Sequence, residues 1–216
     1  MKPFLCCLVL LTGCKPTAYI ISPNDLRNEK AVLYLIDHSQ ITGEIKISLE
    51  SFSSLQIENK PYIGFIPEGK KTEEHIRLND IIGYSIGPDY FALKKLDLYL
   101  NNTYHLFFVK RLTSENSKIQ LYELYESGKG NTTGEARYTY YLSLPAYGLQ
   151  QTMNTRSIGL LPLFDQKMSQ IVADCPALAA KIRSKEKGYF IPLGSFKTNK
   201  HPEVLLKIIN EYNSCN

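Results

Sequence analysis

Histidine and acidic side chains are the residues of this chain whose types would suit catalysis or metal binding. The four histidines, none of which has the spacing of a paired metal ligand, are His38, His75, His105 and His201. Asp37 directly precedes His38, which places an acid beside a base. Adjacent side chains on a strand point to opposite faces, so we interpret this pair as part of a turn before Ile41. The sequence therefore predicts no catalytic residue, no metal site and no cofactor.

Two glycines bracket a serine in the middle of the chain. Gly83 and Gly87 flank Tyr84-Ser85-Ile86, and this run lies between strand signals. We interpret it as turns rather than as the nucleophile elbow of a serine hydrolase, which needs a strand followed by a helix. The sequence also lacks the Gly-x-x-x-x-Gly-Lys-[Ser/Thr] loop that holds phosphates.

The first residues have the layout of a secretory signal. Lys2 is followed by an apolar run from Phe4 to Leu11 and then by small residues. A helix needs roughly 20 apolar residues to cross a bilayer, so this run is too short for a retained membrane span. We therefore expect residues 1–13 to be a cleaved signal peptide.

The segment Leu11-Thr12-Gly13-Cys14 resembles the lipobox of bacterial lipoproteins, in which an aliphatic residue and two small residues precede a cysteine. The resemblance covers about the first 14 residues. It implies cleavage before Cys14, diacylation of its sulfur and acylation of the new amine. Each buried CH₂ contributes about 0.8 kcal/mol, so two or three chains would anchor the protein essentially permanently. The alternative is an ordinary secretory signal, which more often has an Ala-x-Ala cleavage site.

Lys15 bears on the expected location. In enteric bacteria an Asp after the lipidated cysteine tends to retain a lipoprotein in the inner membrane, so the resemblance implies the outer membrane for a chain with Lys15. We expect the protein to face the periplasm. The formal charge of +4 becomes +3 once Lys2 is removed, and the basic residues are scattered. This charge distribution disfavours nucleic acid as a partner.

Two cysteines remain for cross-linking once residues 1–13 are removed and Cys14 carries lipid: Cys175 and Cys215. Such a pair usually joins in an oxidising compartment. Cys175 precedes Pro176 at the start of a predicted helix, and Cys215 follows the end of another, so antiparallel helices would bring the two together. Redox catalysis or metal binding by the pair is the alternative, which the absence of Cys-x-x-Cys and of a neighbouring histidine disfavours.

Strand signals dominate the part of the chain that must position these residues. We expect a lipidated tether at 14–30 and a β-rich domain at 31–161. From Ile41 to Leu49 apolar residues alternate with polar ones, which is typical of an antiparallel strand with one wet face. The other expected strands lie at 31–36, 61–66, 75–79, 90–96, 104–110, 118–125 and 137–144, with a hairpin between 110 and 118.

Helical periodicity replaces this pattern after residue 161. Pro162, Pro176 and Pro202 each stand where a helix can begin. Apolar stripes at helical spacing follow each proline, which predicts three helices over 162–216 that pack on the sheet. The expected fold is therefore α+β, with an antiparallel sandwich-like or barrel-like sheet followed by a three-helix segment.

The C-terminal part resembles β-rich bacterial envelope lipoproteins of uncharacterised function. The resemblance rests on Asp174-Cys175-Pro176 and Tyr212-Asn213-Ser214-Cys215, and it implies no known activity. Tyr138, Tyr140, Tyr141 and Tyr147 would offer stacking faces to a glycan or a protein, but cross-strand aromatic pairs are the favoured interpretation. We expect a membrane-anchored, non-enzymatic binding module with an envelope protein or a glycan as its partner. The alternative is a periplasmic hydrolase.

Overall fold

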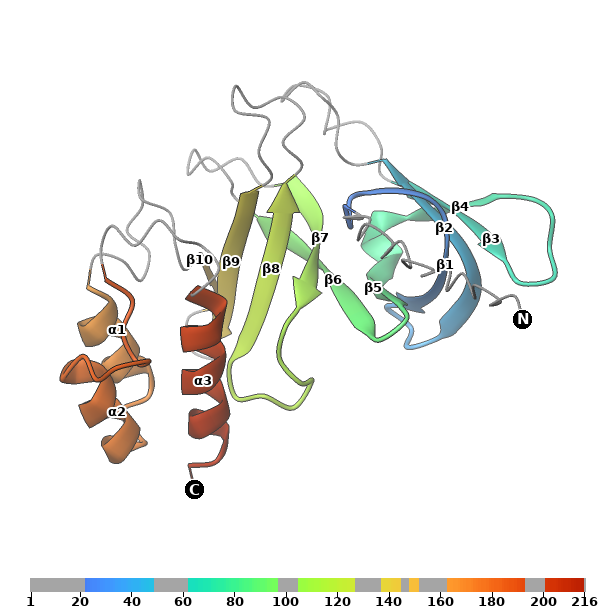
Figure 1. The fold of residues 1–216 in the computed structure, drawn as a ribbon. Coiled ribbons are helices and arrows are strands. Elements are labelled where there is room, and N and C mark those ends of the chain that lie inside the picture. Colours follow the sequence, from blue (N-terminus) through green and yellow to red (C-terminus); the bar gives the residue numbers. More distant parts are fainter. Residues whose placement is uncertain are drawn as a thin grey trace, which may run out of the picture.

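Ten strands and three helices make up the part of the chain that the computed structural model describes, residues 22–48, 62–96, 105–126, 137–144, 148–151, 163–192 and 201–215. The strands form one antiparallel sheet, and the helices follow it in the chain and lie at one end of it (Figure 1). The predicted α+β class is therefore confirmed. The predicted signal peptide and Cys14 lie outside the described residues.

The sheet consists of two meanders that meet where β5 pairs with β1. The strands are β1 (Asp25–Leu35), β2 (Gln40–Ser48), β3 (Tyr62–Pro67), β4 (Glu74–Arg77), β5 (Ile81–Ile86), β6 (Asp89–Leu96), β7 (His105–Arg111), β8 (Gln120–Glu126), β9 (Arg137–Leu144) and β10 (Gly148–Gln151). Their order across the sheet is β10-β9-β8-β7-β6-β5-β1-β2-β3-β4. The chain thus returns to β1 before it builds the second half of the sheet.

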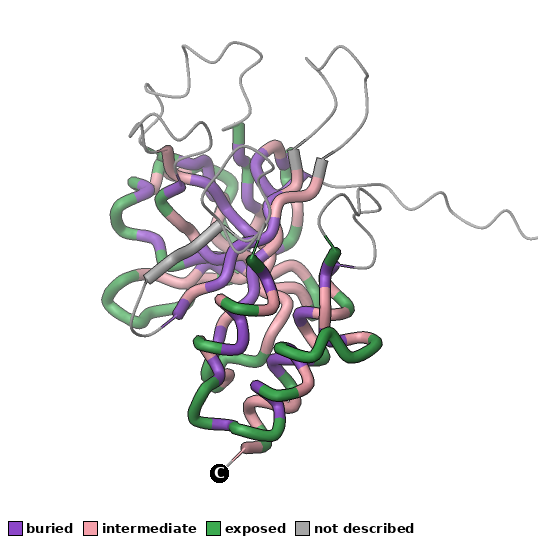
Figure 2. Tube along the Cα trace, turned by 90° about the vertical axis from the view of Figure 1, so that its left-hand side faces the viewer, coloured by how far each residue is buried: buried purple, intermediate pink, exposed green. Residues whose placement is uncertain are grey.

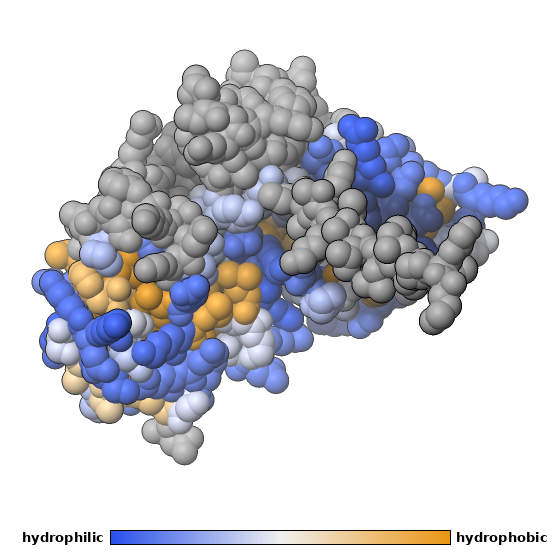
Figure 3. All heavy atoms as spheres, viewed as in Figure 1, coloured by the Kyte–Doolittle hydropathy of each residue, from blue (hydrophilic) through white to orange (hydrophobic). Residues whose placement is uncertain are grey.

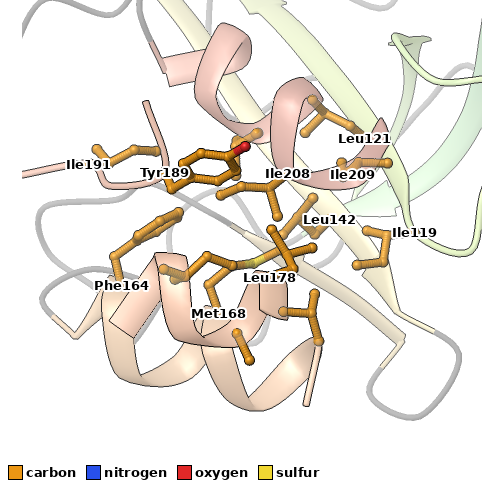
Figure 4. Close-up of a cluster of buried hydrophobic side chains, with 14 of the residues drawn as sticks. Ile119, Leu121, Leu142, Phe164, Met168, Leu178, Tyr189, Ile191, Ile208 and Ile209 are labelled. Atoms are coloured by element: carbon orange, nitrogen blue, oxygen red, sulfur yellow. The ribbon is translucent and has the colours of Figure 1, made fainter. Parts of the chain in front are cut away.

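Three helices cover the C-terminal strands: α1 (Phe164–Ile171), α2 (Pro176–Arg183) and α3 (His201–Asn213). Pro176 occupies the first turn of α2, where its missing N–H costs no hydrogen bond. The predicted apolar stripes face inward, and Phe164, Met168, Leu178 and Ile208 meet Leu142 of β9 in a shared core (Figure 4). Hydrophobic residues also gather on the visible surface of this helical end (Figure 3). No helix in the described ranges has the length and apolarity that spanning a bilayer requires.

Two further cores follow from the alternation of side chains along the strands. The N-terminal core joins β1, β2, β3 and β5 with Phe108 of β7. A third core lies on β6 to β9 and includes Phe107 and Val109, the neighbours of Phe108 that point the other way. Strand β7 is therefore buried on both faces from Phe107 to Val109, whereas buried positions recur at every second residue along β2 from Gly43 to Ile47. Figure 2 shows the buried residues of the described chain in purple.

Strand β5 corrects the interpretation of Gly83 to Gly87 as turns. The strand covers Ile81 to Ile86, and the turn is limited to Gly87 and Pro88. A Cβ atom on Gly83 would lie 2.3 Å from the carbonyl oxygen of Phe91 in the neighbouring strand. Glycine is therefore required here by close approach of two strands. In the sequence alone, a glycine required by close strand packing cannot be told from a glycine that marks a turn.

Residues 22–24, directly before β1, are part of the fold, although the sequence predicted a tether as far as residue 30. β1 begins at Asp25, six residues before the expected start of the β domain, and Ser22, Pro23 and Asn24 are buried. The Tyr84 hydroxyl donates a hydrogen bond to the Pro23 carbonyl (2.8 Å). Tertiary contacts of this kind leave no local signal, so the polar composition of the segment suggested a tether.

Asn24 connects this segment to the middle of the sheet. Its side chain accepts a hydrogen bond from the backbone N–H of Phe108 (2.8 Å) and donates one to the Phe108 carbonyl (3.0 Å). Strands β7 and β8 pair at Lys110 and Arg111 but not at Phe108 in the recorded register. Phe108 pairs with Leu93 of β6 on one side of β7, and the Asn24 amide takes the place of a strand partner on the other side. It also satisfies two buried backbone groups.

Cys175 and Cys215 lie at disulfide distance, as the sequence predicts, with their Cα atoms 5.9 Å apart. This separation is typical of disulfides. Cys175 directly precedes α2, and Cys215 follows the end of α3 by two residues. Cys175 is buried in the helical core, so the pair connects the two helices at the edge of that core.

The Tyr-Asn-Ser-Cys tail has a structural role beside this pair. The Tyr212 hydroxyl donates to the carboxylate of Asp174 (2.9 Å). Asn213 accepts a hydrogen bond from the backbone N–H of Lys118 (2.9 Å) and donates one to the Ser117 hydroxyl (2.8 Å). Both sequence motifs therefore attach the end of α3 to α2 and to the β7–β8 hairpin.

Several tyrosines form the expected cross-strand pairs. Tyr125 lies directly opposite Tyr138, with ring centroids 5.3 Å apart. Tyr122 lies opposite Tyr141, and both side chains are buried in the third core. These four rings therefore stabilise the sheet. Tyr147 lies outside the described residues.

Candidate binding groove

A groove of about 470 Å³ opens where β1 and β5 end and β6 begins, beside the β7–β8 hairpin. This volume suits a small ligand. The groove is lined by Tyr34, Leu35, His38, Ser39, Gln40, Ile82, Ser85, Gly87, Pro88, Tyr90, Arg111 and Glu115. The lining combines aromatic rings, hydroxyls and one guanidinium, which are groups that orient a polar ligand.

The β1–β2 turn forms one wall of the groove. Asp37 accepts hydrogen bonds from the backbone N–H of Ser39 (2.9 Å) and from its hydroxyl (2.6 Å). These bonds hold the pKa of the Asp37 carboxyl below its usual range. His38 adopts the left-handed backbone conformation, with φ of +66°. The predicted turn at Asp37 and His38 is therefore confirmed, and the Asp37 carboxylate is engaged within that turn.

Two tyrosines form the floor of the groove. The rings of Tyr34 and Tyr90 meet edge to face, with centroids 5.4 Å apart. The Tyr34 hydroxyl lies 3.3 Å from the Ser85 hydroxyl, within hydrogen-bonding distance. Burial raises the pKa of Tyr90, an effect that the positive charge of Arg111 opposes. The Tyr90 phenol is therefore a neutral hydrogen-bonding group at ordinary pH.

Arg111 supplies the positive charge of the groove. Its guanidinium carbon lies 4.4 Å from the centroid of the Tyr90 ring, so the two groups form a cation–π contact. The side chain is 20% exposed, whereas that of Glu115, the acid beside it, is 81% exposed. Arg111 Nη2 and Glu115 Oε2 are 3.8 Å apart, which exceeds hydrogen-bonding distance. Arg111 is thus held by stacking and only weakly paired with an acid.

Ser85 belongs to a run whose letters match Gly-x-Ser-x-Gly, Gly83-Tyr84-Ser85-Ile86-Gly87. In a nucleophile elbow this pattern turns from a strand into a helix. Here β5 turns through Gly87 into the antiparallel strand β6, and Ser85 lies opposite Tyr90 on that strand. The backbone is therefore not that of an elbow. Ser85 and His38 nevertheless line the same groove.

The opposite face of the sheet carries a separate polar cluster. Lys110 precedes Arg111 on β7 and forms an ion pair with Asp89 (2.7 Å). Glu123 lies directly opposite Lys110 on β8. Burial raises the pKa of Glu123, while a hydrogen bond with Tyr140 and the charge of Lys110 oppose the rise.

The sequence predicted few of the groove residues. Cys175 and Cys215 do not line the groove, and Cys14 lies outside the described residues. Tyr34, Tyr90 and Arg111 were not proposed as site residues, because each stands in an ordinary strand pattern. Their meeting depends on the pairing of β1 with β5 and of β6 with β7. The turn at Asp37 and His38 was the one local signal nearby.

Comparisons of the chain with protein-family models, with characterised proteins and with solved structures find no significant match.

Proposed function

We propose that this chain is a lipid-anchored protein of the bacterial cell envelope that binds a ligand or partner without transforming it. The observation that carries the proposal is the lipobox-like segment Leu11-Thr12-Gly13-Cys14 directly after a short apolar run. The approach of Cys175 to Cys215 supports an oxidising compartment such as the periplasm. The proposed location is the periplasmic face of the outer membrane.

Labelling with palmitate tests the anchor. Cells that express the wild-type chain should incorporate label into the protein, whereas Cys14→Ala should abolish incorporation because the acceptor sulfur is gone. Cys7→Ala is the matched control, because this cysteine lies in the apolar run and should leave labelling unchanged. Equal labelling of wild type and Cys14→Ala, or a mature chain that still begins at Met1, would contradict the proposal.

The groove beside Tyr34, Tyr90 and Arg111 is the proposed binding surface. Its polar lining suits recognition through hydrogen bonds and ring stacking more than the burial of a large apolar face. Ile82, which lines it, is 38% exposed and offers an apolar contact beside these polar groups. An envelope protein segment or a glycan fragment would both meet such a surface, and nucleic acid is not proposed.

A periplasmic hydrolase is the alternative, and one observation favours it: Ser85 and His38 line the same groove. A serine nucleophile needs a base that takes its proton. The hydroxyl of Ser85 instead lies beside that of Tyr34, and Asp37 is bonded to Ser39. A fluorophosphonate probe should therefore leave the protein unlabelled. Labelling that Ser85→Ala abolishes would favour the hydrolase over the binding module.

A further inference from the structure

We infer that the groove binds the free carboxylate of a small ligand, such as the C-terminus of a peptide, through the guanidinium of Arg111. This inference rests on the proposed binding role of the groove and adds the chemical class of the ligand. It depends on three features of the described residues: the orientation of Arg111, the hydrogen-bonding capacity that this side chain retains, and the charge around it.

The orientation of Arg111 comes from its contact with Tyr90. The ring covers one side of the guanidinium at 4.4 Å, and the ring is itself held edge to face by Tyr34. A guanidinium with a fixed plane presents its N–H groups as a fork, which matches the two oxygens of a carboxylate. Strand β7 and the tyrosine pair therefore prepare Arg111 for bidentate binding with little loss of conformational freedom.

The hydrogen-bonding capacity of Arg111 is largely unused. A guanidinium has five N–H donors. Within the described residues these donors make no hydrogen bond shorter than the 3.8 Å approach to Glu115. Because the side chain is only 20% exposed, water reaches it incompletely, and a ligand oxygen would replace weak contacts with strong ones.

The charge around Arg111 favours a ligand with a single negative charge. Arg111 is the one arginine or lysine among the lining residues, and Glu115 is the one acid among them. The Asp37 carboxylate is engaged in hydrogen bonds from Ser39. Lys110 points to the opposite face of the sheet and forms an ion pair with Asp89. A carboxylate brings one negative charge, which the charge of Arg111 matches, whereas a phosphate dianion brings two and is repelled more strongly by Glu115.

Titration of the full-length protein in a mild detergent tests the inference. The probes are N-acetyl-alanyl-alanine, its C-terminal amide and inorganic phosphate, and calorimetry measures the affinity of each. Wild type should bind the acid at least about tenfold more tightly than the amide, because the amide cannot accept two charge-assisted hydrogen bonds. Arg111→Gln should remove this preference. Arg111→Lys keeps the positive charge but lacks the forked N–H groups of a guanidinium, so it should retain only part of the preference for the acid over the amide.

The matched control is Lys110→Gln, which removes an equal charge from the adjacent residue on the other face and should leave binding unchanged. If Arg111→Gln does not fold, Arg111→Lys alone decides the role of the fork. Three outcomes would overturn the inference: equal binding of acid and amide, an unchanged preference in Arg111→Lys, or phosphate as the tighter ligand. Palmitate labelling at Cys14 does not depend on this groove, so failure here and failure of the anchor are distinguishable.

Discussion

Replacing both Cys175 and Cys215 with alanine is expected to lower the free energy of unfolding by about 4 kcal/mol. The two residues are 40 positions apart, and a bridge that closes a loop of this length restricts the unfolded chain by roughly that amount in the chain-entropy model. The loss should appear as a lower urea midpoint under oxidising conditions. The end of α3 should also loosen, because only non-covalent contacts, such as the hydrogen bonds of Tyr212 with Asp174 and of Asn213 with Lys118, would then hold it.

Reduction of the wild-type protein is the internal control for this prediction. Wild type with a strong thiol reductant should unfold at the same urea concentration as the double variant, and the reductant should leave the variant itself unchanged. Mass mapping without reduction should recover the peptides of Cys175 and Cys215 as one linked species. Two free thiols in the protein isolated from the envelope would show that the observed proximity is not a covalent bridge in the cell.

Replacing Asn24 with alanine is expected to cost about 3 kcal/mol of folding free energy. The Asn24 side chain is 1% exposed and makes two hydrogen bonds to the backbone of Phe108, itself buried in the N-terminal core. Truncation leaves an N–H and a carbonyl without partners in a region that excludes water, and each such group costs about 1–3 kcal/mol. The change should appear in urea unfolding and in faster hydrogen exchange at the Phe108 amide.

Asn210→Ala is the matched control, since Asn210 lies on the exposed side of α3. Its free energy of unfolding should stay within about 0.5 kcal/mol of wild type. Asn24→Asp provides a sharper comparison, because it keeps the shape and removes the N–H₂ donor to the Phe108 carbonyl. A midpoint for Asn24→Ala that matches the control would mean that residues 22–24 contribute little to the sheet.

Regular patterns in the sequence predicted most of the elements. The alternation from Ile41 onward corresponds to β2, and the stripe that begins at Phe164 corresponds to α1. The prolines predicted where helices begin, and Pro176 indeed lies in the first turn of α2. These successes have one cause: a residue that must face a core recurs at the period of its own element, whatever it packs against.

The failures arose where the decisive neighbour is distant in the chain. Gly83 has no side chain because the carbonyl of Phe91 passes close to it, and Asn24 is buried because it bonds to the backbone of Phe108, which β8 does not pair. Neither requirement can be seen in the residues on either side. A glycine between strand signals suggested a turn, and a polar segment after the predicted signal peptide suggested a tether.

The sequence by itself determined the α+β class, the sites at which helices begin and the two late cysteines that meet. These features depend on the local periodicity of apolar residues and on residue types, such as proline and cysteine, that have few possible structural roles. Only the tertiary structure decided that β5 returns beside β1 and that Arg111 stacks on Tyr90 in the lining of a groove. Strand order and side-chain stacking depend on pairing between segments that are far apart in the sequence. The free energy of such pairing depends on both segments at once, so neither segment alone reveals it.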